Sequence, residues 1–186
     1  TGTVTQGKPR LTDCLAAEGV TEEELLCVAA SVEQPSEHPL SRAVTEAAQE
    51  RSIPLCDVAD FAAVPGGGVH AALHGETVFA GNADYMRQNG VDIDAFSAQA
   101  EIWANDGKTV LYFAQQGRAL GMLAVADTVK PDSAAAIAAL KRSGCRVVLL
   151  TGDNTQTANA IARQVGVDRV IAQVLPQDKA QCVADL

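Results

Sequence analysis

Apolar residues recur at helical spacing in two segments near the start of the chain. After Thr21 they return every three or four positions, and Thr21 begins a capping box with the glutamate three residues later. This pattern predicts a helix that ends near Gln34. A second apolar stripe follows Pro39, with Ser36 as the expected N-cap. The two stripes together predict a helical hairpin whose elbow is formed by residues 33–38.

The middle of the chain alternates between apolar and polar residues, as half-buried strands do. Strands are expected at 58–64, 69–73, 77–80, 109–115 and 118–126. Glycine-containing turns separate these segments, and short helices are expected after Asn82 and before Gly107. The pattern therefore predicts an antiparallel sheet flanked by helical hairpins, an α+β unit over residues 10–125.

The last third of the chain follows a different pattern, in which helices alternate with continuous apolar strands. Helices are expected at 133–143, at 155–165 and after 176, and strands at 146–150 and 170–172. This order is typical of a parallel α/β sheet. The first 13 residues lack helical spacing and predict a strand end that leads into a linker. We therefore expect residues 1–9 and 126–186 to form part of an α/β unit into which the α+β unit is inserted.

Composition narrows the possible functions. The chain has 186 residues, of which 47% are hydrophobic and 4% aromatic, and its net charge is −9. It lacks an apolar run long enough to cross a bilayer. The acidic balance and the scarcity of aromatic residues argue against nucleic-acid binding. Five cysteines lie far apart without a CxxC pair, which favours free thiols in a reducing compartment. The chain begins with threonine and stops within an expected helix, as a piece of a longer protein would.

The segment Thr151-Gly152-Asp153-Asn154 follows a buried strand of the predicted parallel sheet. Open α/β sheets bind ligands at the carboxyl ends of their strands, and the amides at a helix N-terminus favour anions. The segment is therefore a candidate phosphate site. An equally weighted alternative is that Gly152 makes a turn and Asn154 caps a helix.

Two glycine segments could let the backbone approach a ligand, because no Cβ atom intrudes. They are Gly66-Gly67-Gly68, followed by Val69, and Gly81, followed by Asn82. For each segment taken alone, an ordinary turn or helix cap is the favoured interpretation.

The segment Ser36-Glu37-His38-Pro39-Leu40 is more distinctive. A histidine beside a proline in the first helical turn presents its flat ring in a set direction, where it could stack on or hydrogen-bond to a base. The alternatives are an exposed elbow histidine at His38 and a solvated helix-end charge at Glu33.

The order of these motifs resembles that of heavy-metal-transporting P-type ATPases (type IB), most closely the bacterial copper exporters. The motifs, in order, are TGTVTQGKP, SEHPL, a GxG loop, GN, D-x-x-K-P, TGDN and LPxxK. The resemblance covers the whole chain. It implies that residues 10–125 are a nucleotide-binding domain inserted into a partial phosphorylation domain of haloacid-dehalogenase-like, Rossmann-type fold. It also implies that residues 127–131 form the hinge between the two domains.

The resemblance also assigns residue roles. Glu33 and His38 would face the adenine of ATP. The remaining residues implied to line the ATP site are Gly66, Gly68, Val69, Gly81 and Asn82. Those implied to act around the transferred phosphoryl group are Thr1, Thr3, Thr151, Gly152, Asp153 and Lys179. Among these, Thr1 would help to hold Mg²⁺ through its backbone, and Lys179 would neutralise the phosphoryl charge.

For the intact protein, the resemblance implies ATP-driven export of copper(I) or another soft heavy metal through an aspartyl-phosphate intermediate. The chain would be a cytoplasmic part of an integral membrane protein, in the inner membrane of a bacterium. Its partners would be ATP, the metal bound elsewhere, and the membrane and actuator domains of the same transporter.

In this interpretation the nucleophilic aspartate precedes Thr1, so the chain alone is expected to be monomeric and to bind ATP without hydrolysing it. Two alternatives remain at this point. One is a free-standing phosphatase of the haloacid-dehalogenase type, and the other is a non-catalytic module that binds adenine nucleotides and needs only residues 10–125.

Overall fold

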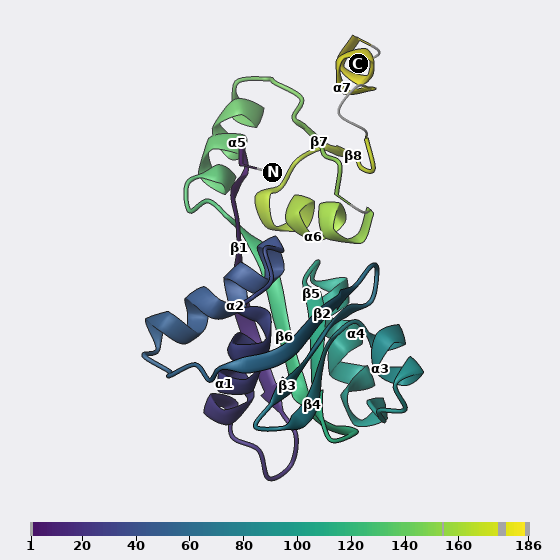
Figure 1. Ribbon diagram of the computed structural model, residues 1–186. Coiled ribbons are helices and arrows are strands. Elements are labelled where there is room, and N and C mark those ends of the chain that lie inside the picture. The colour runs from purple at the N-terminus through teal and green to yellow at the C-terminus, as the bar shows by residue number, and fades with distance from the viewer. Residues whose placement is uncertain (1, 154, 175–177, 185–186) are drawn as a thin grey trace. The chain divides into compact units, whose positions relative to one another are not determined.

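The structure, a computed structural model, describes residues 2–153, 155–174 and 178–184. The chain divides into two compact units (Figure 1). We call the first the sheet unit; it consists of Lys8–Glu101 and Thr109–Ala126. We call the second the α/β unit; it consists of Thr1–Gly7, Ile102–Lys108 and Asp127–Leu186.

A six-stranded sheet in the order β1-β6-β5-β4-β3-β2 dominates the structure. Its strands are β1 (Thr5–Ala16), β2 (Val58–Val64), β3 (Gly68–Leu73), β4 (Glu76–Gly81), β5 (Thr109–Gln115) and β6 (Arg118–Val129). Each neighbouring pair from β2 to β6 is antiparallel. The antiparallel sheet predicted from the alternating pattern is therefore confirmed.

The expected linker near the N-terminus is instead the 12-residue strand β1. Thr12 Oγ1 donates to the Ala124 carbonyl at 3.3 Å, and the Ala17 amide donates to the Leu120 carbonyl at 2.8 Å. The strand lies at the end of the sheet order, and many of its side chains are exposed. It can therefore hold polar residues, Gly7 and Pro9, which hide a strand from a pattern-based prediction.

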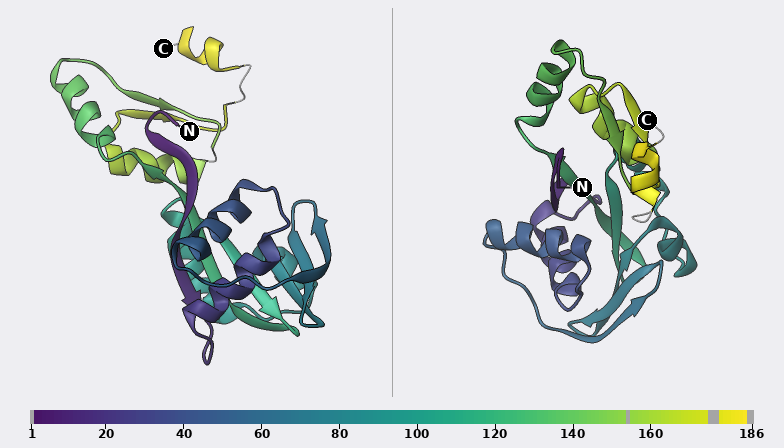
Figure 2. Two further views of the ribbon diagram at one scale, coloured as in Figure 1. Left: turned by 60° about the vertical axis from the view of Figure 1, so that its left-hand side comes forward. Right: turned by 90° about the horizontal axis from the view of Figure 1, so that it is seen from above.

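Helices cover both faces of the sheet. They are α1 (Glu22–Glu33), α2 (Pro39–Glu50), α3 (Ala83–Gln88) and α4 (Ser97–Asn105), with a 3-10 turn at Asp94–Phe96. In β4, Val78 and Ala80 are buried in the core beneath α1, whereas Phe79 meets the Tyr85 ring of α3 edge-on. Because successive strand residues point to opposite faces, α1 and α3 lie on opposite sides of the sheet (Figure 2).

Helix α1 begins with the predicted capping box. The Thr21 hydroxyl accepts from the Glu24 amide at 3.1 Å, and the Glu24 carboxylate accepts from the Thr21 amide at 2.8 Å. Replacing Thr21 with alanine is expected to lower the unfolding free energy by about 1 kcal/mol, measured by urea unfolding. Thr45→Ala, at a half-buried position of α2, is the control and should change it little, since the Thr45 hydroxyl donates to the Arg42 carbonyl within the helix and does not cap its end. Equal losses in both variants would contradict a role of the capping box.

The expected N-cap of α2, Ser36, is wrong by two residues. His38 is the N-cap, and its Nδ1 atom accepts from the Leu40 amide at 3.2 Å. Pro39 occupies the first helical position, where its missing amide hydrogen costs nothing. The histidine at the elbow is therefore held by the backbone of the helix it begins.

The α/β unit contains α5 (Ser133–Arg142), β7 (Val148–Leu150), α6 (Thr155–Val165), β8 (Arg169–Ile171) and α7 (Lys179–Ala184). Strands β7 and β8 pair in parallel, as the alternating order predicts. The buried residues of its core are Ile137, Ile161 and Val165. Both strands have three residues, so β7 is shorter than its apolar run.

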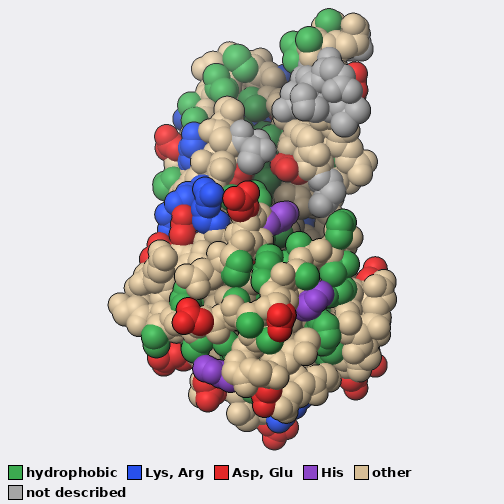
Figure 3. Space-filling view, in the orientation of Figure 1, with side chains coloured by type: hydrophobic (Ala, Val, Ile, Leu, Met, Phe, Trp, Pro, Cys, Tyr) green, Lys and Arg blue, Asp and Glu red, His purple; other side chains and the backbone are tan. Residues whose placement is uncertain are grey.

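Within the described residues, no helix is both long and apolar enough to span a membrane. On the face shown in Figure 3, acidic side chains are spread over the surface, and most of the visible basic ones gather in one group. The excess of acidic side chains agrees with the net charge of −9.

Candidate functional site

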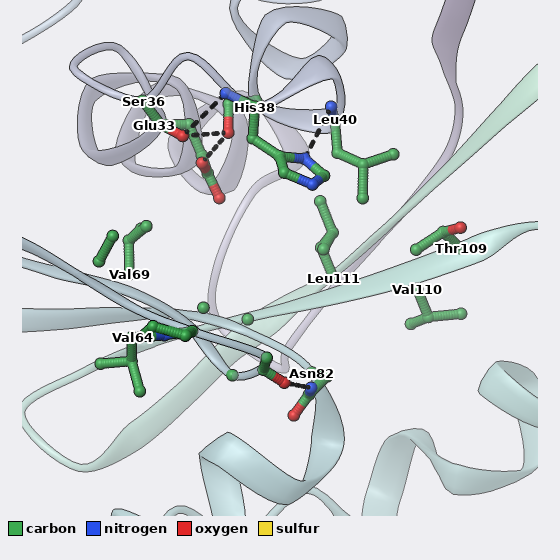
Figure 4. A pocket seen from close by; sticks show the side chains of 17 residues that line it. Glu33, Ser36, His38, Leu40, Val64, Val69, Asn82, Thr109, Val110 and Leu111 are labelled. Atoms are coloured by element: carbon green, nitrogen blue, oxygen red, sulfur yellow. Dashed lines mark hydrogen bonds between the residues drawn. The ribbon is translucent and has the colours of Figure 1, made fainter.

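A cavity of about 470 Å³ opens within the sheet unit (Figure 4). Four segments bound it: the α1–α2 elbow, the glycine loop between β2 and β3, the end of β4 with Asn82, and the start of β5. Its lining includes Glu33, His38, Gly66, Gly68, Val69, Gly81 and Asn82. The residues that the sequence nominates for the ATP site therefore all lie around one cavity, although they come from three separate segments, 33–38, 66–69 and 81–82.

Glu33 ends α1 and is only 5% exposed, so the solvated-charge alternative is wrong. Ser41 Oγ donates to Glu33 Oε2 at 2.5 Å, and the other carboxyl oxygen points away from the serine into the cavity (Figure 4). Burial raises the pKa of Glu33 above its usual value, while the Ser41 hydrogen bond and the His38 charge lower it in part. The cavity thus has a buried carboxyl group with one oxygen free to accept a hydrogen bond.

His38 faces the same cavity, with its ring directed toward Leu111 (Figure 4). Because Nδ1 accepts from the Leu40 amide, the proton of the neutral ring belongs on Nε2. The capping contact therefore fixes both the direction of the ring and its tautomer. The exposed-histidine alternative holds only in part: the residue is exposed, but its ring lines the cavity.

The glycines at the base of the cavity pack against one another. Gly68 pairs with Gly81 across β3 and β4, and a Cβ atom on Gly68 would lie 2.0 Å from the Ala80 carbonyl oxygen. Asn82 caps α3 by accepting from the Tyr85 amide at 2.9 Å, and its Nδ2 donates to the Gly66 carbonyl at 2.7 Å. The side chain of Asn82 thus joins the glycine loop to a helix.

Apolar side chains and three hydroxyl side chains complete the lining. The apolar members from outside the glycine loop are Leu40, Ala63, Val64, Val69, Val110 and Leu111, and the hydroxyl residues are Ser36, Ser41 and Thr109. Among the described residues, the lining contains no lysine or arginine. The cavity suits a flat, partly apolar ligand with a few hydrogen-bonding groups.

Sequence reasoning missed Ser41 as a residue of this site. Ser41 is 3% exposed in the first turn of α2. A signal for it does exist: a hydroxyl on the apolar stripe of a helix requires a buried partner. Leu111 gave no such signal, since an apolar residue in a strand is expected in the core.

The candidate phosphate loop lies in the α/β unit at the end of β7. Thr151 is 3% exposed, its hydroxyl donates to Asp153 Oδ2 at 2.6 Å, and it accepts from the Asp153 amide at 3.1 Å. The Val174 amide donates to the Thr151 carbonyl at 3.1 Å. Gly152, between Thr151 and Asp153, is exposed. The loop is therefore held in place by its own side chains and by the segment after β8.

The remaining nominated residues are less informative. Thr3 is exposed, and Lys179 begins α7. Thr1 and Asn154 lie outside the described residues. In the part of the chain that the structure describes, no three His, Cys, Asp or Glu side chains gather as metal ligands.

Comparison with known proteins identifies the family. The model of the haloacid dehalogenase-like hydrolases matches residues 1–186. The chain belongs to this family. Its place in the haloacid dehalogenase-like family agrees with the parallel β7–β8 pair and with the Thr151 loop at the end of β7. The family match supports the haloacid-dehalogenase-like fold that the resemblance implies.

Within the haloacid dehalogenase-like family, the chain is similar to metal-transporting ATPases. It is 44% identical over its whole length to a copper-transporting P-type ATPase of Rhizobium leguminosarum bv. viciae and covers 22% of that protein. It is 45% identical to a copper-exporting P-type ATPase of Staphylococcus saprophyticus and covers 23% of it. The resemblance to heavy-metal P-type ATPases is therefore confirmed, and the phosphatase and isolated-module alternatives are not favoured.

A solved structure supports the same assignment. The crystal structure of a zinc-transporting PIB-type ATPase in the E2.Pi state matches the whole chain with a TM-score of 0.89 and 37% identity, over 30% of that protein. The chain thus matches a portion both of relatives named for copper and of a solved structure named for zinc.

Proposed function

We propose that this chain is the ATP-binding unit of a P-type ATPase that exports copper(I) or another soft heavy metal and forms an aspartyl-phosphate intermediate. The sheet unit would be the nucleotide-binding domain, inserted into a phosphorylation domain to which the α/β unit belongs. The observation that carries the proposal is the cavity, where the buried Glu33 carboxyl and the His38 ring face apolar side chains. Similarity over the whole chain to copper-transporting ATPases supports it.

The cavity favours adenine over guanine. Adenine carries an amino group where guanine carries a carbonyl oxygen, and an ionised carboxylate can only accept a hydrogen bond. Glu33 would therefore accept from the adenine amino group and repel the guanine oxygen. His38 Nε2 would donate to a ring nitrogen, and Leu40 and Leu111 would contact the base.

The chain's acidic character is compatible with this ligand. The cavity lining provides shape and a few polar groups rather than positive charge, so ATP would bind as its Mg²⁺ complex with reduced charge. In the α/β unit, Thr151, Gly152, Asp153 and Lys179 would engage the transferred phosphoryl group. The metal would bind elsewhere in the transporter, and this portion would lie on the cytoplasmic side of the membrane.

An NMR titration with ATP, AMP and GTP tests the proposal. Amide shifts are expected at 33–38, 66–69 and 81–82 with ATP and AMP, and smaller ones with GTP. If these segments do not respond while the Thr151 loop responds to phosphate, the cavity is not the nucleotide site. AMP is the informative ligand, because it carries the adenine with a single phosphate.

Replacing His38 with asparagine separates the two contacts of this side chain. Asparagine is among the best N-caps, so the unfolding free energy should stay within about 0.5 kcal/mol of the wild type. The ring is lost, so AMP affinity should fall about fivefold or more. His38→Ala loses the cap as well and should also be destabilised by about 1 kcal/mol. Wild-type affinity in a folded His38→Asn variant would show that the ring does not contact the base.

A further inference from the structure

A chain of hydrogen bonds runs through the α1–α2 elbow and ends at the Glu33 carboxyl. Ser41 Oγ lies 2.5 Å from Glu33 Oε2 and 2.9 Å from Ser36 Oγ. The His38 amide nitrogen lies 3.3 Å from Ser36 Oγ. Figure 4 shows these contacts at one wall of the cavity. Both residues that would recognise the base, Glu33 and His38, are therefore tied to the same two serines.

The number of available protons sets the direction of this chain. The His38 amide can only donate, and an ionised Glu33 can only accept. Each serine hydroxyl has one hydrogen, so Ser41 donates to Glu33, Ser36 donates to Ser41, and the His38 amide donates to Ser36. Hydrogen bonds aligned in one direction polarise and strengthen one another. The last bond, to Glu33 Oε2, is therefore the one that the chain reinforces.

We propose that Ser41 is a positioning residue of the nucleotide pocket: it holds one oxygen of Glu33, so that the other oxygen faces the base. This inference rests on the proposed function and goes further by naming a residue that sets the ligand-accepting state of the site. Burial restricts the Glu33 side chain as a whole, and the Ser41 bond in addition fixes which carboxyl oxygen faces the cavity. Ordering the carboxyl group before the ligand arrives removes an entropy cost from binding.

A second buried serine provides the contrast. Ser31 is 0% exposed in α1; its hydroxyl donates to the Cys27 carbonyl at 2.7 Å and accepts from the Cys56 amide at 2.9 Å. Both partners are backbone groups, so the Ser31 hydroxyl stabilises the fold. Ser31 is not among the residues that line the cavity. The two serines are alike in chemistry and burial but differ in what they bind.

The Ser41 bond also affects the proton equilibrium of Glu33. Burial raises the pKa of Glu33, and the hydrogen bond from Ser41 opposes this rise because it favours the ionised form. The other titratable group that faces Glu33 in the described lining is His38, whose charge acts in the same direction as Ser41. Without the Ser41 hydroxyl the pKa of Glu33 should rise further, and the acceptor should be lost at a higher pH.

The test compares Ser41→Ala, Ser41→Thr and the control Ser31→Ala in the whole 186-residue chain. AMP affinity is measured as a function of pH, and the Glu33 carboxyl resonance is titrated by NMR without nucleotide. Ser41→Ala should weaken AMP binding about three- to tenfold at neutral pH and move the loss of binding to higher pH. Ser41→Thr keeps the hydroxyl and should restore both properties to within about twofold of the wild type.

The outcomes separate this inference from the proposed function. Ser31→Ala is expected to melt earlier but to keep the wild-type pH profile. If Ser41→Ala binds AMP with wild-type affinity and pH profile, or leaves the Glu33 titration unchanged, Ser41 is not a positioning residue while the proposed function stands. If the wild type binds no AMP at any pH, the proposed function fails and this role fails with it.

Discussion

Replacing Gly68 with alanine is expected to lower the unfolding free energy of the protein by about 3 kcal/mol or more, or to prevent folding. The added Cβ atom would lie 2.0 Å from the Ala80 carbonyl oxygen and 2.6 Å from the Gly81 Cα atom. Both are backbone atoms of β4, opposite Gly68 in the ladder. They cannot rotate away as a flexible side chain would, so the two strands would have to separate.

Thermal melting and urea unfolding measure the effect, and Gly66→Asn is the control. Gly66 has a positive φ of 73° and open space around its Cα atom. Asparagine tolerates this conformation, so the control should cost about 1 kcal/mol or less. If Gly68→Ala has the same melting temperature and unfolding free energy as Gly66→Asn, the two strands can separate without loss of stability.

This prediction bears on how the glycines are assigned to the ATP site. Gly68 and Gly81 both line the cavity, but each is also required by the close approach of β3 and β4. A variant at either position that fails to bind ATP would therefore not identify a ligand contact, because the base of the cavity would be disrupted. Glu33 and His38 are the better positions for testing the site.

Local signals made much of the fold predictable. The capping box at Thr21 and the cap at Asn82 each depend on neighbouring residues, and both are present. Alternation is clearest in β3, where every second residue is buried, whereas β5 and β6 bury consecutive residues and follow from their apolar runs. The strand β1 could not be predicted in this way, since its place depends on β6, more than a hundred residues later in the chain.

The candidate site was predictable in its residue types but not in its contacts. His38 stands out beside a proline, yet its role as N-cap in place of Ser36 depends on the backbone angles at the elbow. The burial of Glu33 depends on a partner eight residues later, Ser41, in the next helix. Sequence spacing does not reveal that contact, because it arises from the packing of two helices.

Replacing Glu33 with glutamine is expected to abolish most of the discrimination between adenine and guanine nucleotides. A carboxylate can only accept a hydrogen bond, whereas a glutamine side chain can present either its oxygen or its NH₂ group. Ser41 can accommodate both orientations, because its hydroxyl can donate or accept. AMP should therefore bind more weakly and GMP more tightly, and the ratio of the two affinities should fall about tenfold or more.

Although Glu33→Gln should bind AMP more weakly, its unfolding free energy at neutral pH should be higher than that of the wild type. Because the folded pKa of Glu33 is raised, the folded protein binds a proton more tightly than the unfolded chain does. The wild type should therefore lose unfolding free energy as pH rises from the ordinary glutamate pKa of about 4.3 through the raised value. Glu33→Gln should not lose unfolding free energy in this way, because glutamine does not titrate. Urea unfolding on both sides of that pH window measures the difference.

Glu37→Gln is the matched control, since it removes the same charge from an exposed residue of the elbow that does not line the cavity. It should leave the AMP-to-GMP affinity ratio unchanged. Calorimetric titration of each variant with the two nucleotides gives the ratio directly. If Glu33→Gln keeps the wild-type ratio while Glu37→Gln alters it, recognition of the base lies at the rim of the elbow rather than at the buried carboxyl group.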